Sequence, residues 1–147
     1  MVCMKKIAVL SDIHGNYIAF QKCLEYVLGM GIRAFIFLGD YLGEFPYPQK
    51  TMEILYSLKE KYTCFFLRGN KEDYWISRKY DKNCVWKNGN STVGAILACH
   101  GSPDKNNEKM FPVGENTKGI MERCAGQYIL CGHTHVQGSF SHEGKIL

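Results

Sequence analysis

Side chains that can bind metal ions occur along this chain in short motifs, each of which contains a glycine. The motifs are Asp12-Ile13-His14-Gly15, Gly39-Asp40, Gly69-Asn70, His100-Gly101 and Gly132-His133-Thr134-His135. Carboxylates, amide oxygens and imidazoles together suit manganese, iron, nickel or zinc ions. Because a structural zinc ion usually takes four ligands, the larger number of donors indicates two ions. We therefore predict a dinuclear metal site held by Asp12, His14, Asp40, Asn70, His100, His133 and His135.

Two divalent ions about 3.5–4 Å apart can activate water as hydroxide and stabilise both oxygens of an in-line displacement at phosphorus. A carboxylate such as Asp40 can bridge them. This chemistry predicts a phosphoesterase in which a metal-bridging hydroxide attacks phosphorus, with Asp40, Asn70 and His100 as catalytic residues. Plainer interpretations stay open for single motifs, because Gly39-Asp40 could form only a turn and Gly69-Asn70 only a helix cap.

An apolar run rich in branched and aromatic residues precedes each motif. These runs are Ile7–Leu10, Ala34–Leu38, Cys64–Leu67, Val93–Cys99 and Tyr128–Cys131. Continuous apolar runs of this length are typical of strands buried in a parallel sheet. Because the carboxyl ends of parallel strands lie along one edge of a sheet, we expect the polar motifs to meet there.

Segments with a helical spacing of apolar residues alternate with these runs, at Tyr17–Leu28, Gln49–Lys61 and Glu115–Cys124. Alternating strands and helices predict an α/β fold. The chain has 147 residues, of which 46% are hydrophobic, so we expect one domain over residues 1–147. Asn16 could either lie near the first metal ion or cap the helix that begins after it.

In this order the motifs resemble those of the calcineurin-like metallophosphoesterase superfamily, and within it the small phosphodiesterases of the YfcE type. The resemblance implies a β-sandwich flanked by helices, with the metal ions at the carboxyl ends of strands. It further implies two divalent ions, with manganese expected and nickel, iron, zinc or magnesium as alternatives, and a small phosphodiester or nucleotide as substrate. One ion would be held by Asp12, His14, Asp40 and His135, and the other by Asp40, Asn70, His100 and His133.

The sequence departs from this family pattern at three places. Where many relatives have a histidine that protonates the leaving group, this chain has Lys71. Lys71 could steady phosphate charge or be a solvated surface lysine, and substrates with good leaving groups are favoured. The short interval before His100 indicates a deletion there, and the chain stops at Leu147, where relatives continue into further strands. A shortened sandwich is therefore expected, with an exposed sheet edge.

Composition narrows the expected partners and compartment. The formal net charge of +4 is mild, so no stable nucleic-acid binding is expected. The segment Arg68–Lys87 interleaves basic and aromatic residues, and could either stack bases or cover the sheet. No run approaches the roughly 20 apolar residues of a membrane span, and Ile7–Leu10 is too short for a signal peptide. With seven cysteines and no Cys-x-x-Cys motif, we expect a reducing, cytoplasmic location.

Two other interpretations come from the same resemblance. A eukaryotic retromer subunit resembles this subfamily and uses the fold for protein contacts, so a protein-interaction scaffold is one alternative. A truncated, inactive copy that retains metal binding is the other. The intact set of candidate ligands favours the hydrolase, and a homo-oligomer remains open.

Overall fold

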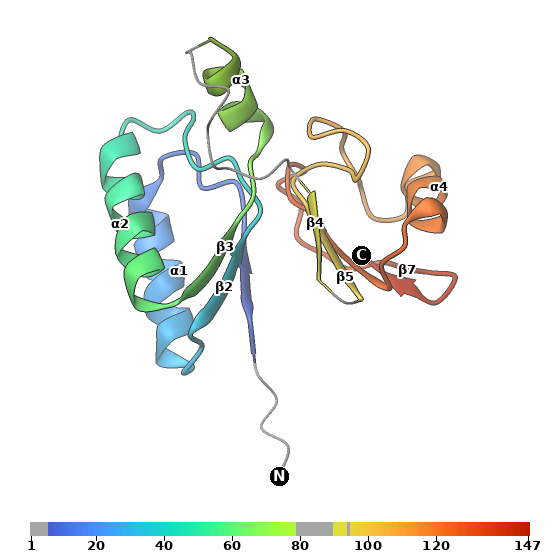
Figure 1. Cartoon of the computed structure of the whole chain (residues 1–147), viewed down its shortest axis with the longest axis horizontal. Coiled ribbons are helices and arrows are strands. Elements are labelled where there is room, and N and C mark those ends of the chain that lie inside the picture. Colours follow the sequence, from blue (N-terminus) through green and yellow to red (C-terminus); the bar gives the residue numbers. More distant parts are fainter. Residues whose placement is uncertain (1–5, 79–89, 94) are drawn as a thin grey trace.

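The computed structural model describes residues 6–78, 90–93 and 95–147. Its first half is a three-stranded parallel sheet in the order β1-β2-β3, formed by β1 (Ala8–Leu10), β2 (Ala34–Phe37) and β3 (Thr63–Phe66). The helices α1 (Tyr17–Gly29) and α2 (Pro48–Lys61) both cover one face of this sheet (Figure 1). These elements confirm the strands and helices expected from the first half of the sequence.

Alternation of side chains along β2 determines which face of this sheet receives the helices. Phe35 and Phe37 are fully buried in the core shared with α1 and α2, and the Phe37 ring stacks on Phe66 at a centroid distance of 5.0 Å. The side chain of Asn16 accepts a hydrogen bond from the amide of Ala19, which shows that Asn16 caps α1. This helix layer holds the sheet, and with it the loops that follow β1 and β2.

The second half is a five-stranded mixed sheet in the order β4-β5-β6-β8-β7. Its strands are β4 (Asn90–Val93), β5 (Ile96–Cys99), β6 (Tyr128–Leu130), β7 (Ser141–His142) and β8 (Lys145–Ile146). The β5, β6 and β8 strands are parallel, whereas β4 and β7 run antiparallel to their neighbours. The helix α4 (Glu115–Arg123) covers the outer face of this sheet (Figure 1), where Met121 packs against Cys99 and Ile129.

The two sheets face each other as a sandwich. Leu38 and Leu67, which follow β2 and β3, pack against Ala98 of β5 between the sheets. Farther along the same face of the first sheet, Val9 and Phe65 remain 42% and 53% exposed. The apolar contact between the sheets is therefore concentrated at the end that carries the polar loops.

Two expectations about the second half need correction. Val93–Cys99 is not one strand, because Val93 ends β4 and pairs with Ile96 of β5 in an antiparallel hairpin. The run could not reveal this turn, because Val93 before it and Ile96–Cys99 after it are all apolar. The interval before His100, where we expected a deletion, also retains a helix, α3 (Asn70–Arg78), and the strand β4. Part of the basic and aromatic segment, including Tyr80 and Trp86, lies outside the described residues.

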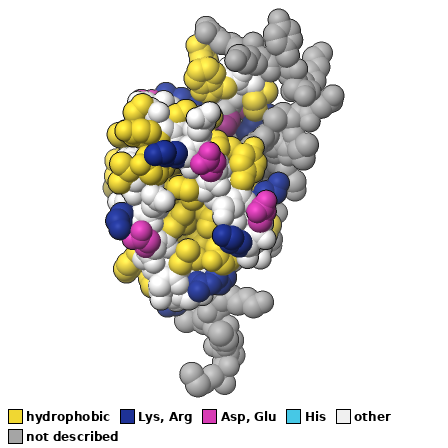
Figure 2. Space-filling model, turned by 90° about the vertical axis from the view of Figure 1, so that its left-hand side faces the viewer, with side chains coloured by type: hydrophobic (Ala, Val, Ile, Leu, Met, Phe, Trp, Pro, Cys, Tyr) yellow, Lys and Arg dark blue, Asp and Glu magenta, His cyan; other side chains and the backbone are white. Residues whose placement is uncertain are grey.

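The outer face of α1 and α2 carries exposed apolar side chains, among them Tyr26, Met30 and Tyr56. Figure 2 shows hydrophobic side chains on this face with charged side chains between them. A shallow hollow of about 350 Å³ lies between the two helices, and its lining includes Leu28, Ile54 and Tyr62. None of the helices among the described residues combines the length and the hydropathy that a membrane span requires.

Candidate metal centre

Backbone hydrogen bonds continue beyond the strand ends and draw the polar loops together. The amide of Asp12 donates to the carbonyl of Gly39 at 3.0 Å, and that of His14 to the carbonyl of Asp40 at 2.9 Å. In the second sheet, the amide of Gly132 donates to the carbonyl of His100 at 2.8 Å. Loops that follow adjacent strands are therefore adjacent to each other as well.

Asp12, His14 and His135 form one group of converging donor atoms. The Nε2 atoms of His14 and His135 lie 3.1 Å apart. Asp12 Oδ1 lies 3.6 Å from the first of these nitrogens and 3.2 Å from the second. His14 is buried whereas His135 is exposed, so this group opens to solvent on one side.

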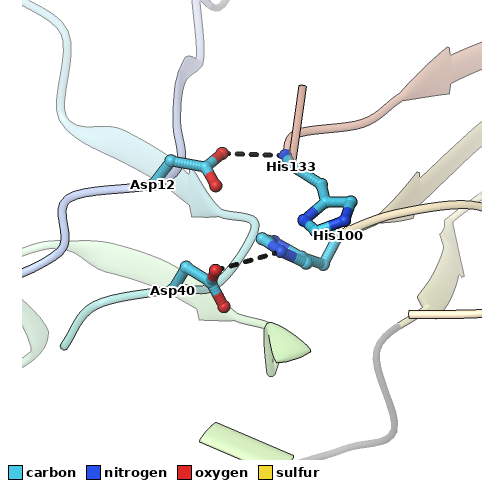
Figure 3. A group of neighbouring side chains, drawn as sticks. All are labelled: Asp12, Asp40, His100 and His133. Atoms are coloured by element: carbon cyan, nitrogen blue, oxygen red, sulfur yellow. Dashed lines mark hydrogen bonds and ion pairs between the residues drawn. The ribbon is translucent and has the colours of Figure 1, made fainter. Parts of the chain in front are cut away.

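A second group consists of Asp12, Asp40, His100 and His133. In Figure 3 the two carboxylates come from the loops of the first sheet and point toward the two imidazoles from the second sheet. His100 Nε2 lies 3.4 Å from Asp40 Oδ2, and the amide of His133 donates to Asp12 Oδ2 at 2.9 Å. Because Asp12 belongs to both groups, they are adjacent.

Asn70 joins the second group through His100. Its Oδ1 lies 2.9 Å from His100 Nε2, on a ring that is completely buried. The other ring nitrogen, Nδ1, lies 3.0 Å from the carbonyl of Leu38. When Nδ1 carries the proton and donates to that carbonyl, the Nε2 lone pair is directed toward Asn70 and Asp40.

All seven residues predicted from the sequence therefore lie in one place, at the ends of five strands. Asp40 Oδ2 lies between the two groups, 3.8 Å from His14 Nε2 and 3.4 Å from His100 Nε2. We expected Asp40 to bridge the ions, and the geometry places both Asp40 and Asp12 between the groups. Metal binding by these side chains stays a prediction, and so does the identity of the carboxylate that bridges the two ions.

Five residues of the site have a backbone conformation that is uncommon for residues other than glycine. Positive φ angles between 51° and 65° occur at Asp12, His14, Asp40, His133 and His135. Among the other described residues, Val113 and Glu143 are the only ones besides glycines that have a positive φ angle. Such conformations cost free energy and cluster at functional sites, where the surrounding structure maintains them.

Glycines allow the loops to approach the carboxylates closely. A Cβ at Gly69 would overlap Oδ1 and the backbone nitrogen of Asp40. A Cβ at Gly132 would lie 2.7 Å from Asp12 Oδ2. Both positions therefore require the absence of a side chain, which explains why glycine accompanies the polar residues in these motifs.

Electrostatics at the site favour the ionised form of Asp12 and shift the pKa values of the histidines in different directions. Although burial opposes it, contacts with His14, Ser11 and the His133 amide hold the pKa of Asp12 well below its usual range. The carboxylate of Asp12 raises the pKa of His14, and Asp40 raises that of His100 against the effect of burial. Burial and the nearby His100 lower the pKa of His133.

These donors suit divalent metal ions. Asp12 Oδ1 is buried and has no hydrogen-bond partner among the described residues, although two imidazole nitrogens face it. A buried carboxylate oxygen without a hydrogen bond is costly, and a cation would offset that cost. Carboxylate and imidazole donors within 4.8 Å of one another are a ligand set for first-row transition metals.

Sequence reasoning missed two carboxylates beside the site. Glu72 accepts hydrogen bonds from the amides of Asp40, Tyr41 and Gly69 at 2.8, 2.9 and 2.9 Å. Its position three residues after Gly69, at the start of α3, is that of the glutamate in a helix capping box and could have identified it. Glu44, whose Oε2 lies 2.8 Å from His14 Nδ1, has no such signal because it belongs to a loop thirty residues away.

Solved structures of known proteins share this architecture. A hypothetical protein, PH1004, from Pyrococcus horikoshii OT3 aligns over 95% of this chain and 73% of its own, with a TM-score of 0.75 and 16% identity. A metallophosphoesterase from Sphaerobacter thermophilus aligns over 88% of this chain and 60% of its own, with a TM-score of 0.68 and 21% identity. YfcE, a phosphoesterase from E. coli, aligns over 88% and 69%, with a TM-score of 0.58 and 22% identity. The resemblance in fold therefore extends over nearly all of the chain.

Comparison of sequences also relates this chain to phosphoesterases. A protein of Schizosaccharomyces pombe named "Putative serine/threonine-protein phosphatase C22H10.04" is 32% identical over 91 residues, which are 59% of this chain. That match covers only 30% of the yeast protein, so the chain spans less than a third of its length. The family model of calcineurin-like phosphoesterases matches residues 5–137, which include all seven candidate ligands. The chain therefore belongs to the calcineurin-like phosphoesterase family.

Proposed function

We propose that this chain hydrolyses a small phosphodiester or a nucleotide with the help of two divalent ions, with manganese as the native metal. The observation that carries the proposal is the convergence of two adjacent donor groups that share Asp12. One ion in each group would be an arrangement suited to displacement at phosphorus. Bound there, the ions would lower the pKa of a coordinated water and neutralise charge on the phosphoryl oxygens.

The residues around the site hold the donors in place for this reaction. The backbone amide of Lys71 donates to Asp40 Oδ1 at 2.9 Å, which leaves Oδ2 directed at the imidazoles of His14 and His100. The carbonyl of Leu38 fixes the ring of His100 through Nδ1. We infer that Asp40, Asn70 and His100 contact the substrate phosphate or its ions most directly.

The residue after Asn70 bears on the kind of substrate. Lys71 Nζ lies 2.6 Å from Glu44 Oε1, and this carboxylate raises the pKa of Lys71. A lysine with a raised pKa gives up its proton reluctantly, so it is a poor acid for a departing alkoxide. We therefore favour phosphodiesters whose leaving groups need no protonation, rather than alkyl phosphate monoesters.

We also keep the cytoplasm as the proposed compartment. The cysteines that the structure describes, Cys23, Cys64, Cys99, Cys124 and Cys131, are all free thiols. Burial raises the pKa of Cys131, beside the histidine motif, to about 11. Protonated, unpaired thiols fit a reducing compartment.

The experiment is to strip the protein of metal and measure hydrolysis of bis(p-nitrophenyl) phosphate and p-nitrophenyl phosphate. Manganese, nickel, magnesium and zinc are then added back singly. Turnover of the diester that depends on added metal is the expected result. Faster turnover of the monoester would instead assign the chain to phosphatases, the activity for which the yeast relative is named.

Folded, metal-loaded protein that hydrolyses neither compound would favour the scaffold or inactive-copy alternatives. Folding is checked by thermal unfolding and metal loading by elemental analysis of the same sample. These controls separate loss of catalysis from loss of structure.

A further inference from the structure

The carboxylate of Glu44 lies beside the outer nitrogen of the His14 ring. Its Oε2 lies 2.8 Å from His14 Nδ1, whereas Nε2 of the same ring faces Asp12, Asp40 and His135. Nδ1 is buried and, within the described residues, has no hydrogen bond of good geometry. The carboxylate of Glu44 is therefore placed to supply the partner that this nitrogen lacks.

The backbone fixes the loop of Glu44 against His14. The amide of Phe45 donates to the carbonyl of His14 at 2.9 Å. A Cβ at Gly43 would lie 2.5 Å from His14 Nδ1, so glycine at that position leaves room for the ring. Glu44 lies between these two contacts, and its approach to His14 follows from the course of the loop.

Lys71 supports both Glu44 and Asp40. Its Nζ lies 2.6 Å from Glu44 Oε1, and its backbone amide donates to Asp40 Oδ1. Lys71 thus contacts the candidate ligand Asp40 through its main chain. Through its side chain it contacts Glu44, whose carboxylate lies next to the candidate ligand His14. This arrangement explains the lysine after Asn70 without requiring it to touch the substrate.

We propose that Glu44 is a positioning residue that orients His14 for metal binding, and that Lys71 holds Glu44 in place. The inference rests on the proposed function only in that His14 binds a metal ion. Histidine ligands usually donate their second ring N–H to a carboxylate, carbonyl or water, which fixes the ring and increases its basicity. Glu44 would perform this role, with Nε2 left for the ion.

Exposure distinguishes this role from a purely structural one. The side chains of Glu44 and Lys71 are 59% and 35% exposed, so their ion pair should add little to stability. A partner of a metal ligand, in contrast, typically changes metal affinity by about 10- to 100-fold. A positioning role therefore predicts a large change in affinity with almost no change in the melting temperature of metal-free protein.

The test measures Mn²⁺ binding to the full, metal-stripped chain by calorimetry, together with thermal unfolding in chelator. For Glu44→Ala we expect about tenfold or greater weakening at one of two sites. Glu44→Gln should lose less, because its amide oxygen can still accept from Nδ1. Lys71→Ala should also lose less, since Glu44 remains. Glu25→Gln, which removes the exposed Lys22–Glu25 ion pair on α1, is the matched control and should leave affinity unchanged.

A double-mutant cycle tests whether Glu44 acts through His14. In a His14→Ala background, Glu44→Ala should have no further effect on Mn²⁺ affinity. An equal loss in both backgrounds, or no loss in the parent background, would overturn the inference. A parent chain that binds no ion would overturn the proposed function as well. A parent chain that binds ions without hydrolysing diesters would reject only the proposed function, because the affinity comparison needs no turnover.

Discussion

The carboxylate of Glu72 accepts a hydrogen bond of 2.8 Å from the backbone amide of Asp40 in the buried centre of the site. The same carboxylate receives the amides of Tyr41 and Gly69. One side chain from the start of α3 therefore joins the loop after β2 to the loop after β3. Asp40 belongs to the first loop and Asn70 begins α3 directly after the second, so Glu72 sets the spacing between these candidate ligands.

Replacing Glu72 by Gln should lower both stability and metal affinity. Each carboxylate oxygen receives an amide, so either orientation of the Gln side chain would direct its NH₂ group at a buried N–H donor. Losing hydrogen bonds to a charged group and leaving a buried donor unsatisfied should cost about 2–4 kcal/mol of unfolding free energy. Denaturant unfolding of metal-free protein measures this, and Glu25→Gln, on the exposed side of α1, should show no loss. Equal stability of parent and Glu72→Gln would contradict the role given to this residue.

Asp40→Asn should abolish most hydrolysis by weakening the binding of both ions at once. Its Oδ2 lies within 3.8 Å of imidazole nitrogens from both donor groups, so its charge contributes to each. Elemental analysis after dialysis should find less metal bound than in the parent, together with diester turnover reduced by about 100-fold or more. Asp104→Asn removes an exposed pairing with Arg123 and serves as control. Parent-like activity and metal content in Asp40→Asn would remove the basis for the assignment.

The sequence predicted the positions of the candidate ligands better than the sheet arrangement that positions them. His133 and His135 could be placed because an apolar run and a glycine precede them, and the parallel pairing of β5 with β6 carries them toward His100. The division into two sheets was implied by family resemblance, whereas the run pattern alone fits one sheet. The β4–β5 hairpin and the short β7 and β8 strands carry too weak a pattern to be recognised. The sequence could not predict the role of Glu44, because its contact with His14 depends on how two loops fold against each other.

Gly69→Ala should disrupt the site, whereas Gly29→Ala should not. A Cβ at Gly69 would overlap the carboxylate and the backbone of Asp40, and the backbone there has little freedom to move because Glu72 binds both residues. At Gly29, the last residue of α1, nothing lies within 4 Å of a Cβ. We expect Gly69→Ala to lose metal binding and diester hydrolysis, and Gly29→Ala to keep both. Calorimetry with Mn²⁺ and the diester assay measure these effects, and full metal binding by Gly69→Ala would refute the proposed fit.

The titration of the buried histidines predicts opposite pH trends for metal-free and metal-bound protein. The pKa values of His14 and His100 are raised, by Asp12 in the first case and by Asp40 against burial in the second. In metal-free protein, their stabilising effect is complete below the unfolded pKa of about 6.5 and is lost as pH rises through the folded values. His133, with its lowered pKa, contributes in the opposite direction. With two raised values against one lowered value, we expect the melting temperature in chelator to fall between about pH 6 and about pH 8.

Metal reverses this trend because imidazole must be neutral to bind an ion. The increase in melting temperature on adding Mn²⁺ should therefore grow over the same pH range. Thermal unfolding of the parent chain, with chelator and with excess Mn²⁺, measures both trends in the same buffers. His14→Gln should flatten the trend in chelator, since it removes one of the two groups with a raised pKa. A melting temperature in chelator that rises with pH in the parent chain would show that Asp12 and Asp40 do not stabilise protonated histidines at this site.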